Sequence, residues 1–203
     1  LSAGNETITL GGTDLDITDD LSINGTNTAG SGTDVTIDAD AGSRIFFVNT
    51  AETVELRNMT VQNGDVTGDG GAIYHIGGGA LNLIGTTVSE SQAGDAGGGI
   101  FNVSGMLTVN ASSILGNEAS TTGGGIHNEG TVNVQNGSSV SSNHAGTDGG
   151  GIYNAGTLTV DNATVATNGA HGDGATNGGG GVFNAAVGVL NLNNSAGVTN
   201  NDA

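Results

Sequence analysis

The sequence predicts an all-β fold, a right-handed parallel β-helix in which each coil takes about 26 residues and contributes three short strands. Three observations predict it: a glycine-rich tag recurs at a nearly constant interval, strands of alternating apolar and polar residues follow each tag, and the chain contains no proline. One such unit cannot bury its apolar side alone, so neighbouring units must stack. Because no linker or helical period interrupts the pattern, we expect a single domain over residues 1–203.

The first element of each coil is a glycine tag that ends in an aliphatic residue and continues with an aromatic residue or His. The aliphatic residues lie 27, 26, 26 and 30 residues apart, and the longest interval carries an insertion at 170–176, which we expect to be a longer loop. Each strand of a solenoid pairs with the equivalent strand of the next coil, so these residues should form an inward column. The predicted column consists of Ile73, Ile100, Ile126, Ile152 and Val182.

The second and third elements are short strands with one buried face. The second alternates apolar, polar and apolar residues, which buries one face and leaves the other in water. The third has an aliphatic residue, then Asn three positions later and Ala five positions later. The inward columns of the second and third elements are Leu81, Leu107, Val132, Leu158 and Leu190, and Val88, Ile114, Val140, Val165 and Val198.

Asparagine recurs at two positions of the coil, one after the tag and one in the third element. Stacked amides can hydrogen-bond to each other along the axis, which satisfies polar groups close to the core. Asn also tolerates the left-handed backbone of sharp corners. The predicted ladders are Asn102, Asn128, Asn154 and Asn184 for the tag, and Asn117, Asn143, Asn168 and Asn201 for the third element.

The first part of the chain follows the same plan less regularly. We expect irregular first coils over residues 1–44 and regular coils over 45–203. Short strands are predicted around residues 8–10, 15–17, 21–23 and 35–37, separated by clusters of Gly, Asn and Asp. Neither end shows a capping helix, so we expect the coils to continue in a longer polypeptide or to meet a partner.

The charge balance excludes several partners. The net charge is −18, with Arg44 and Arg57 as the two basic residues, so a nucleic acid backbone or an anionic membrane would be repelled. No apolar run reaches the length of a transmembrane helix. The remaining partners that we expect are a second copy stacked end to end, an adjoining β-helix of the same polypeptide, and glycans or surfaces of a host or the environment.

Calcium is the one cofactor that the sequence suggests. Acidic residues recur just before the glycine tags, at Asp69, Asp95 and Asp148, and carboxylates with glycine carbonyls suit Ca²⁺. Solvated turn residues are the alternative interpretation. The four histidines show no metal-site spacing: His75 and His127 substitute in structural columns, while His144 and His171 fall in exposed turns.

No convergent catalytic set is visible, so we expect no enzymatic activity. A polysaccharide lyase on such a fold needs Arg or Lys, and both arginines are expected to be solvated surface residues. A glycoside hydrolase needs paired carboxylates. The dense group Asp14, Asp16, Asp19 and Asp20 lies in an early coil without a basic partner.

Gly-Gly-Ala-Ile at 70–73 and the closing pattern of an aliphatic residue, Asn and Ala resemble the repeats of polymorphic outer-membrane proteins. The Phe of that family's second motif is replaced here by Val or Ile. More broadly, the sequence resembles the pectate-lyase-like superfamily of right-handed β-helices, including autotransporter passengers and bacterial surface repeat proteins. The resemblance covers residues 45–203 well and 1–44 loosely, and it implies secretion and display at a cell surface.

Together these features favour an extracellular structural or adhesive solenoid, which stacks end to end into a fibre in one version of the hypothesis. The alternative is a polysaccharide-active β-helix enzyme, either a lyase or a glycoside hydrolase. The two hypotheses differ in whether carboxylates converge on an outward face.

Overall fold

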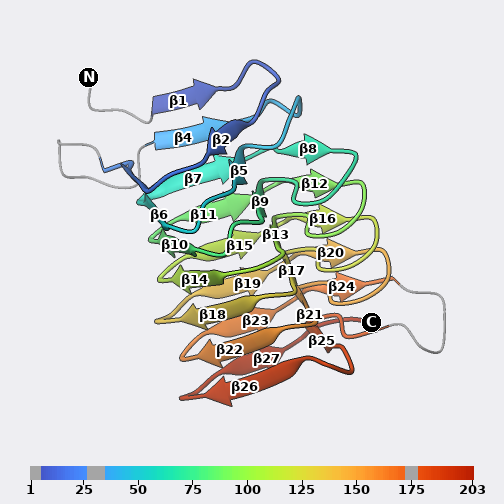
Figure 1. The fold of residues 1–203 in the computed structure, drawn as a ribbon. Coiled ribbons are helices and arrows are strands. Elements are labelled where there is room, and N and C mark those ends of the chain that lie inside the picture. The colour runs from blue at the N-terminus through green and yellow to red at the C-terminus, as the bar shows by residue number, and fades with distance from the viewer. Residues whose placement is uncertain (1–5, 27–34, 172–177) are drawn as a thin grey trace.

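A computed structural model of the chain describes residues 6–26, 35–171 and 178–203. Every regular element in these residues is a strand, and the strands pair in parallel with equivalent strands about 26 residues away. The coils stack from β1 at one end to β26 at the other (Figure 1). The predicted all-β parallel solenoid is therefore confirmed.

The tag sheet is formed by the strands that follow the glycine tags. Its neighbouring strands pair in the predicted register, with Ile73 opposite Ile100, Ile100 opposite Ile126, and so on to Val182. Its strands, in sheet order, are β2 (Leu15–Ile17), β5 (Phe46–Val48), β9 (Ile73–His75), β13 (Ile100–Asn102), β17 (Ile126–Asn128), β21 (Ile152–Asn154) and β25 (Val182–Asn184).

The long-strand sheet contains the second predicted element, whose regular strands have five residues with two inward positions. Leu81 pairs with Leu107, and Leu83 pairs with Val109, all fully buried. Its strands are β3 (Leu21–Asn24), β6 (Thr53–Arg57), β10 (Ala80–Ile84), β14 (Met106–Asn110), β18 (Thr131–Gln135), β22 (Thr157–Asp161) and β26 (Val189–Asn193).

The return sheet contains the third predicted element and brings the chain back along the opposite side of the core. Val88, Ile114, Val140 and Val165 pair in one buried column, as predicted. Its strands are β1 (Glu6–Thr9), β4 (Val35–Asp38), β7 (Met59–Gln62), β11 (Thr87–Ser89), β15 (Ser113–Leu115), β19 (Ser139–Ser141), β23 (Thr164–Ala166) and β27 (Gly197–Thr199).

The structure adds a fourth short strand to the three that the sequence predicts. The third element bends at one residue, with a positive φ at Glu90, Gly116, Ser142 and Thr167, and a two-residue strand follows the bend. These strands form the two-residue sheet, which consists of β8 (Asp65–Val66), β12 (Gln92–Ala93), β16 (Glu118–Ala119), β20 (His144–Ala145) and β24 (Gly169–Ala170).

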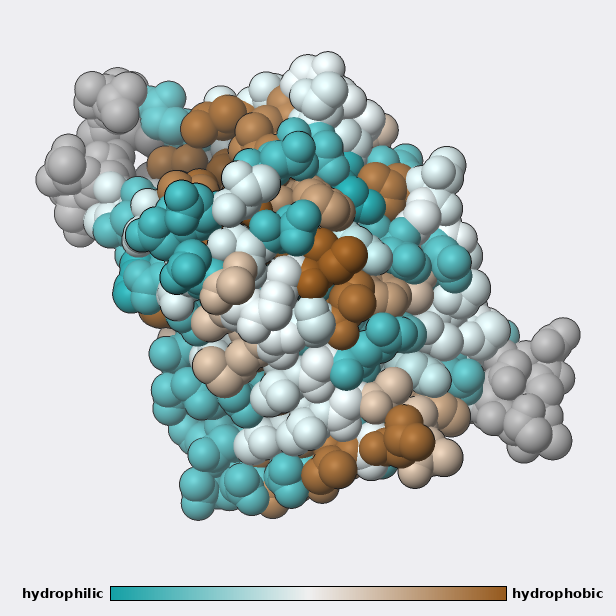
Figure 2. Space-filling model, viewed as in Figure 1, coloured by the Kyte–Doolittle hydropathy of each residue, from teal (hydrophilic) through white to brown (hydrophobic). Residues whose placement is uncertain are grey.

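The core is a thin column of aliphatic residues between the sheets, continuous from Ile17 to Val165. No further described coil covers the inward residues of the last coil. Leu190 and Leu192 are therefore 36% and 51% exposed, although the equivalent residues of the regular coils before it are buried. Figure 2 shows hydrophobic groups at both ends of the stack and another midway along it, on a surface that is otherwise largely hydrophilic or neutral. Among the described residues no helix is long and apolar enough to cross a membrane.

Candidate functional site on the outer surface of the tag sheet

A ladder of stacked aromatic rings runs along the outward face of the tag sheet. Each ring comes from the middle residue of a tag strand, so strand pairing places neighbouring rings one above another. Ring centroids of neighbours are 4.4 to 5.7 Å apart, which is the range of favourable aromatic pairs. The ladder consists of Phe47, Tyr74, Phe101, His127, Tyr153 and Phe183.

Arg44 covers the first rings of this ladder, so the prediction of a solvated surface residue was wrong for it. Its side chain is 16% exposed, and Nη1 forms a 3.0 Å ion pair with Asp14. Nη2 and Nε donate to the carbonyl oxygens of Asp69 and Gly70 at 2.7 and 2.9 Å. The guanidinium also lies 5.1 Å from the Tyr74 ring centroid, a cation–π distance. Sequence reasoning missed these contacts because they join three coils.

His127 is enclosed within the ladder between Phe101 and Tyr153. Its Nδ1 lies 2.8 Å from Thr122 Oγ1, and its Nε2 lies 3.6 Å from Glu129 Oε1. Burial lowers the pKa of His127 below its ordinary value of 6.5, and the Glu129 carboxylate partly opposes that shift. The ring is therefore held mainly neutral at pH 7.

An open groove of about 680 Å³ runs beside the ladder, at the corner between the tag sheet and the long-strand sheet. The connecting turns shorten along it, from four residues at 76–79 to three at 103–105 and two at 129–130. The shorter turns leave a hollow next to the longer ones. The groove is lined by Ala51, Thr53 and residues 78–80, 103–106 and 129–131, of which Glu129 carries the carboxylate.

The tag Asn side chains form an axial ladder of hydrogen bonds behind this face. Asn102 Nδ2 donates to Asn128 Oδ1 at 2.9 Å, Asn128 Nδ2 to Asn154 Oδ1 at 2.8 Å, and Asn154 Nδ2 to Asn184 Oδ1 at 2.7 Å. The first three Asn side chains are fully buried, while Asn184 is exposed in the last coil.

His75 continues this ladder in the preceding coil. Its Nδ1 lies 2.8 Å from Asn102 Oδ1, which can only accept, so His75 carries its proton on Nδ1. Nε2 is buried and has no hydrogen-bond partner among the described residues. Burial lowers the pKa of His75 below 6.5, against the opposing effect of its hydrogen bond to Asn102.

The second Asn column also forms a ladder, at the bend before the two-residue sheet. Asn117 Nδ2 donates to Asn143 Oδ1 at 3.0 Å, and the Asn143 and Asn168 amides repeat this contact toward Asn201. Each Oδ1 also accepts the backbone N–H of the Asn one coil earlier. Ser91 ends the ladder, with its N–H donating to Asn117 Oδ1.

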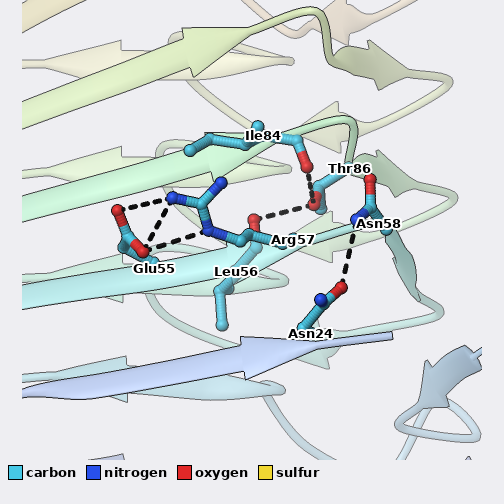
Figure 3. Close-up of polar contacts among 7 residues, drawn as sticks. All are labelled: Asn24, Glu55, Leu56, Arg57, Asn58, Ile84 and Thr86. Atoms are coloured by element: carbon cyan, nitrogen blue, oxygen red, sulfur yellow. Dashed lines mark hydrogen bonds and ion pairs between the residues drawn. The ribbon is translucent and has the colours of Figure 1, made fainter. Parts of the chain in front are cut away.

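A third polar column, which sequence reasoning missed, lies at the corner between the long-strand and return sheets. Thr86, Ser112 and Ser138 are buried, and the hydroxyls of Ser112 and Ser138 accept the N–H of the equivalent residue one coil earlier. Thr86 Oγ1 donates to the Leu56 carbonyl at 2.9 Å (Figure 3). Their spacing of 26 residues was the available signal.

The structure does not bring the three predicted calcium ligands together. Asp69 and Asp148 occupy one column, but Ala96 and Thr122 of the two intervening coils lie between them. Asp95 lies in the adjacent column and accepts a 3.0 Å hydrogen bond from Thr121. Asp69 and Asp148 accept backbone N–H groups of the following coil. No group of three or more His, Asp or Glu residues suited to a metal occurs in the described residues, and calcium binding stays a prediction.

Arg57 pairs with Glu55 on the outward face of β6, with a 2.9 Å contact (Figure 3), so both arginines are engaged with carboxylates. The prediction of an exposed turn was wrong for His144, which lies partly buried in β20, and its ring meets that of His171 with centroids 4.3 Å apart. They lie 27 residues apart, about one coil. Of the predicted loop at 170–176, residues 172–176 lie outside the described residues.

Comparison with protein-family models, with curated proteins and with solved structures finds no match for this chain.

Proposed function

We propose that this chain is an extracellular structural and adhesive rod displayed at a cell surface. The observation that carries the proposal is the set of unbroken axial columns: aliphatic residues, Asn amides and aromatic rings each continue from coil to coil. Such columns resist bending because a bend between any two coils would break several kinds of contact at once. The resemblance to surface repeat proteins adds secretion and display to this proposal.

The adhesive part of the proposal rests on the groove and the ladder beside it. The groove is elongated and open, and its lining offers backbone groups, Thr and Ser hydroxyls and the Glu129 carboxylate. Hydroxyl-rich glycans match a surface of this kind, while the net charge of −18 opposes polyanionic ones. The partners that we propose are therefore neutral glycans of a host or environmental surface.

End-to-end association is part of the same proposal. The last coil carries the exposed apolar side chains of Val189, Leu190 and Leu192 and one unpaired edge of β26. A further coil, from a second copy or from the same polypeptide, would bury them. Light scattering on dilution and electron microscopy should show assemblies longer than one chain. Strictly monomeric particles would contradict self-stacking.

A polysaccharide-active enzyme is the second candidate, because the groove could hold an extended glycan. Glycoside hydrolases need a pair of carboxyl groups, and among the groove-lining residues Glu129 alone supplies one. Lyase chemistry would need a free basic side chain, whereas Arg44 and Arg57 are paired with Asp14 and Glu55.

A glycan panel distinguishes the two candidates. The chain is incubated with neutral and acidic polysaccharides, with and without calcium, and both retention and product formation are measured. The rod proposal predicts retention on neutral glycans without turnover, weakened when Thr53→Arg, at an exposed lining position, obstructs the groove. Reproducible turnover would overturn the ranking. Antibody labelling of intact cells tests surface display.

A further inference from the structure

His144 and His171 come from neighbouring coils and meet on the outer surface of the two-residue sheet. His144 lies in β20, and the N–H of His171, just after β24, donates to the Ala145 carbonyl at 3.0 Å. This backbone bond fixes the two residues one coil apart on the same face. Nε2 of His144 and Nδ1 of His171 face each other in direct contact. We propose that this pair is a binding site for a divalent transition-metal ion such as Cu²⁺, Ni²⁺ or Zn²⁺.

The local backbone leaves room for the two rings. The strand position opposite His144 is Gly169, which has no side chain to separate the rings. A Cβ at this position would contact His144 Cδ2 at 3.6 Å, so the ring lies directly over the glycine. On its other side, His144 pairs with Glu118. His171 is exposed and His144 is partly exposed, so solvent reaches both rings, and a ring rotation that separates the two nitrogens would admit an ion between them.

The chemistry of the two facing nitrogens suits a transition-metal ion. One neutral ring can donate its N–H to the other, but when both rings present their lone pairs they can bind a cation together, and imidazole nitrogen is a preferred ligand of copper, nickel and zinc. The rest of the chain adds to this attraction, because the net charge is −18 and both arginines are paired with carboxylates. Since no group of three or more ligating side chains is found in the described residues, water would fill the remaining coordination positions.

This site differs from the calcium hypothesis for Asp69, Asp95 and Asp148 in both place and chemistry. Calcium takes oxygen ligands, whereas the His144–His171 pair offers nitrogen. It is also independent of the proposed function, because it lies on the two-residue sheet and not at the groove. A transition-metal ion here would join two consecutive coils across their outer surface.

Calorimetry with a tag-free chain tests the proposal, with CuCl₂, ZnCl₂ and CaCl₂ as separate titrants. One copper or zinc ion per chain should bind, and His144→Gln and His171→Ala should each weaken binding at least about tenfold. Gln is compatible with this column, because Gln92 occupies it two coils earlier. The control His127→Phe removes a distant histidine but keeps a ring in the aromatic ladder, and it should leave affinity unchanged.

A second measurement does not depend on the variants. Substoichiometric Cu²⁺ should broaden the amide NMR signals of Ala145 and Ala170 before those of the tag sheet. Circular dichroism of each variant checks that it is folded. The proposal is overturned if the native chain binds neither copper nor zinc, if both His variants bind with native affinity, or if copper broadens signals elsewhere first.

Discussion

Replacing Asn128 by Ala removes the central member of the tag Asn ladder. The Asn128 side chain is fully buried. Its Oδ1 accepts from Asn102 Nδ2 at 2.9 Å, and its Nδ2 donates to Asn154 Oδ1 at 2.8 Å and to the Thr157 carbonyl at 3.1 Å. The substitution therefore breaks three hydrogen bonds at once in a site closed to bulk water.

The expected loss of stability follows from the partners left behind. Asn102 Nδ2 loses its acceptor on Asn128 but keeps a 3.3 Å hydrogen bond to the Thr131 carbonyl. Asn154 Oδ1 and the Thr157 carbonyl each lose a donor, and a buried polar group without a partner costs about 1–3 kcal/mol. Allowing for the lost packing of the amide as well, we expect Asn128→Ala to lower the free energy of unfolding by about 3–5 kcal/mol.

Urea unfolding followed by circular dichroism measures this loss, with two matched controls. Asn184→Ala breaks the ladder at its exposed end and should cost about 1 kcal/mol. Asn133→Thr changes an outward position whose neighbours in the column are Thr108 and Thr159, and it should lie within about 0.5 kcal/mol of the native chain. The ladder argument is refuted if Asn128→Ala costs no more than Asn133→Thr.

Two other predictions follow from burial. His75 and His127 have pKa values lowered by burial below 6.5, so the unfolded chain binds more protons than the folded chain just below that pH. Their contribution to stability is complete above pH 6.5 and is lost as the pH falls toward their folded pKa values. His75→Asn places at this position the residue that the rest of the ladder uses. The free energy of unfolding, measured with urea, should then change less between pH 7 and pH 5 than it does in the native chain. An unchanged pH dependence would contradict a buried, neutral His75. Gly124→Ala would press a methyl group into the backbone carbonyl of His144 and should cost more than about 2 kcal/mol, whereas a Cβ at Gly68 meets no atom within 4 Å. Equal urea midpoints for Gly124→Ala and Gly68→Ala would exclude this steric role.

The inward columns could be predicted because they follow from period alone. Ile100, Ile126 and Ile152 recur at 26-residue intervals with the same neighbours, and strand pairing then fixes their contacts. The same reasoning placed the register of the long-strand and return sheets. Exposure at the last coil could not be read from the pattern, since Leu190 looks identical to its buried equivalents.

The fourth strand was missed because its bend has no constant residue type. Glu90, Gly116, Ser142 and Thr167 share a positive φ but no side-chain chemistry. A two-residue strand is also too short to show alternation. The bend is imposed by the surrounding coils, whose hydrogen bonds to Asn117 and Asn143 hold the backbone there.

Two features, the His144–His171 pair and the hydroxyl column, were missed because the period was not applied to these His, Ser and Thr residues. The interval between His144 and His171 is close to one coil, and Thr86, Ser112 and Ser138 keep the period without exception. Arg44 could not be placed from spacing, since its contacts depend on where the turns of three coils end. The groove likewise depends on turn lengths, which vary from coil to coil.

Methyl NMR tests the central claim, that residues one period apart lie directly above each other. The experiment uses a chain in which the isoleucine methyl groups are labelled. Neighbouring coils lie about 4.8 Å apart, and coils separated by one other coil lie about twice as far apart. The stacked register predicts cross-peaks between Ile100 and Ile126 and between Ile126 and Ile152, with none between Ile100 and Ile152. Absence of the two neighbouring cross-peaks, in a folded sample with assigned methyl signals, would contradict the account.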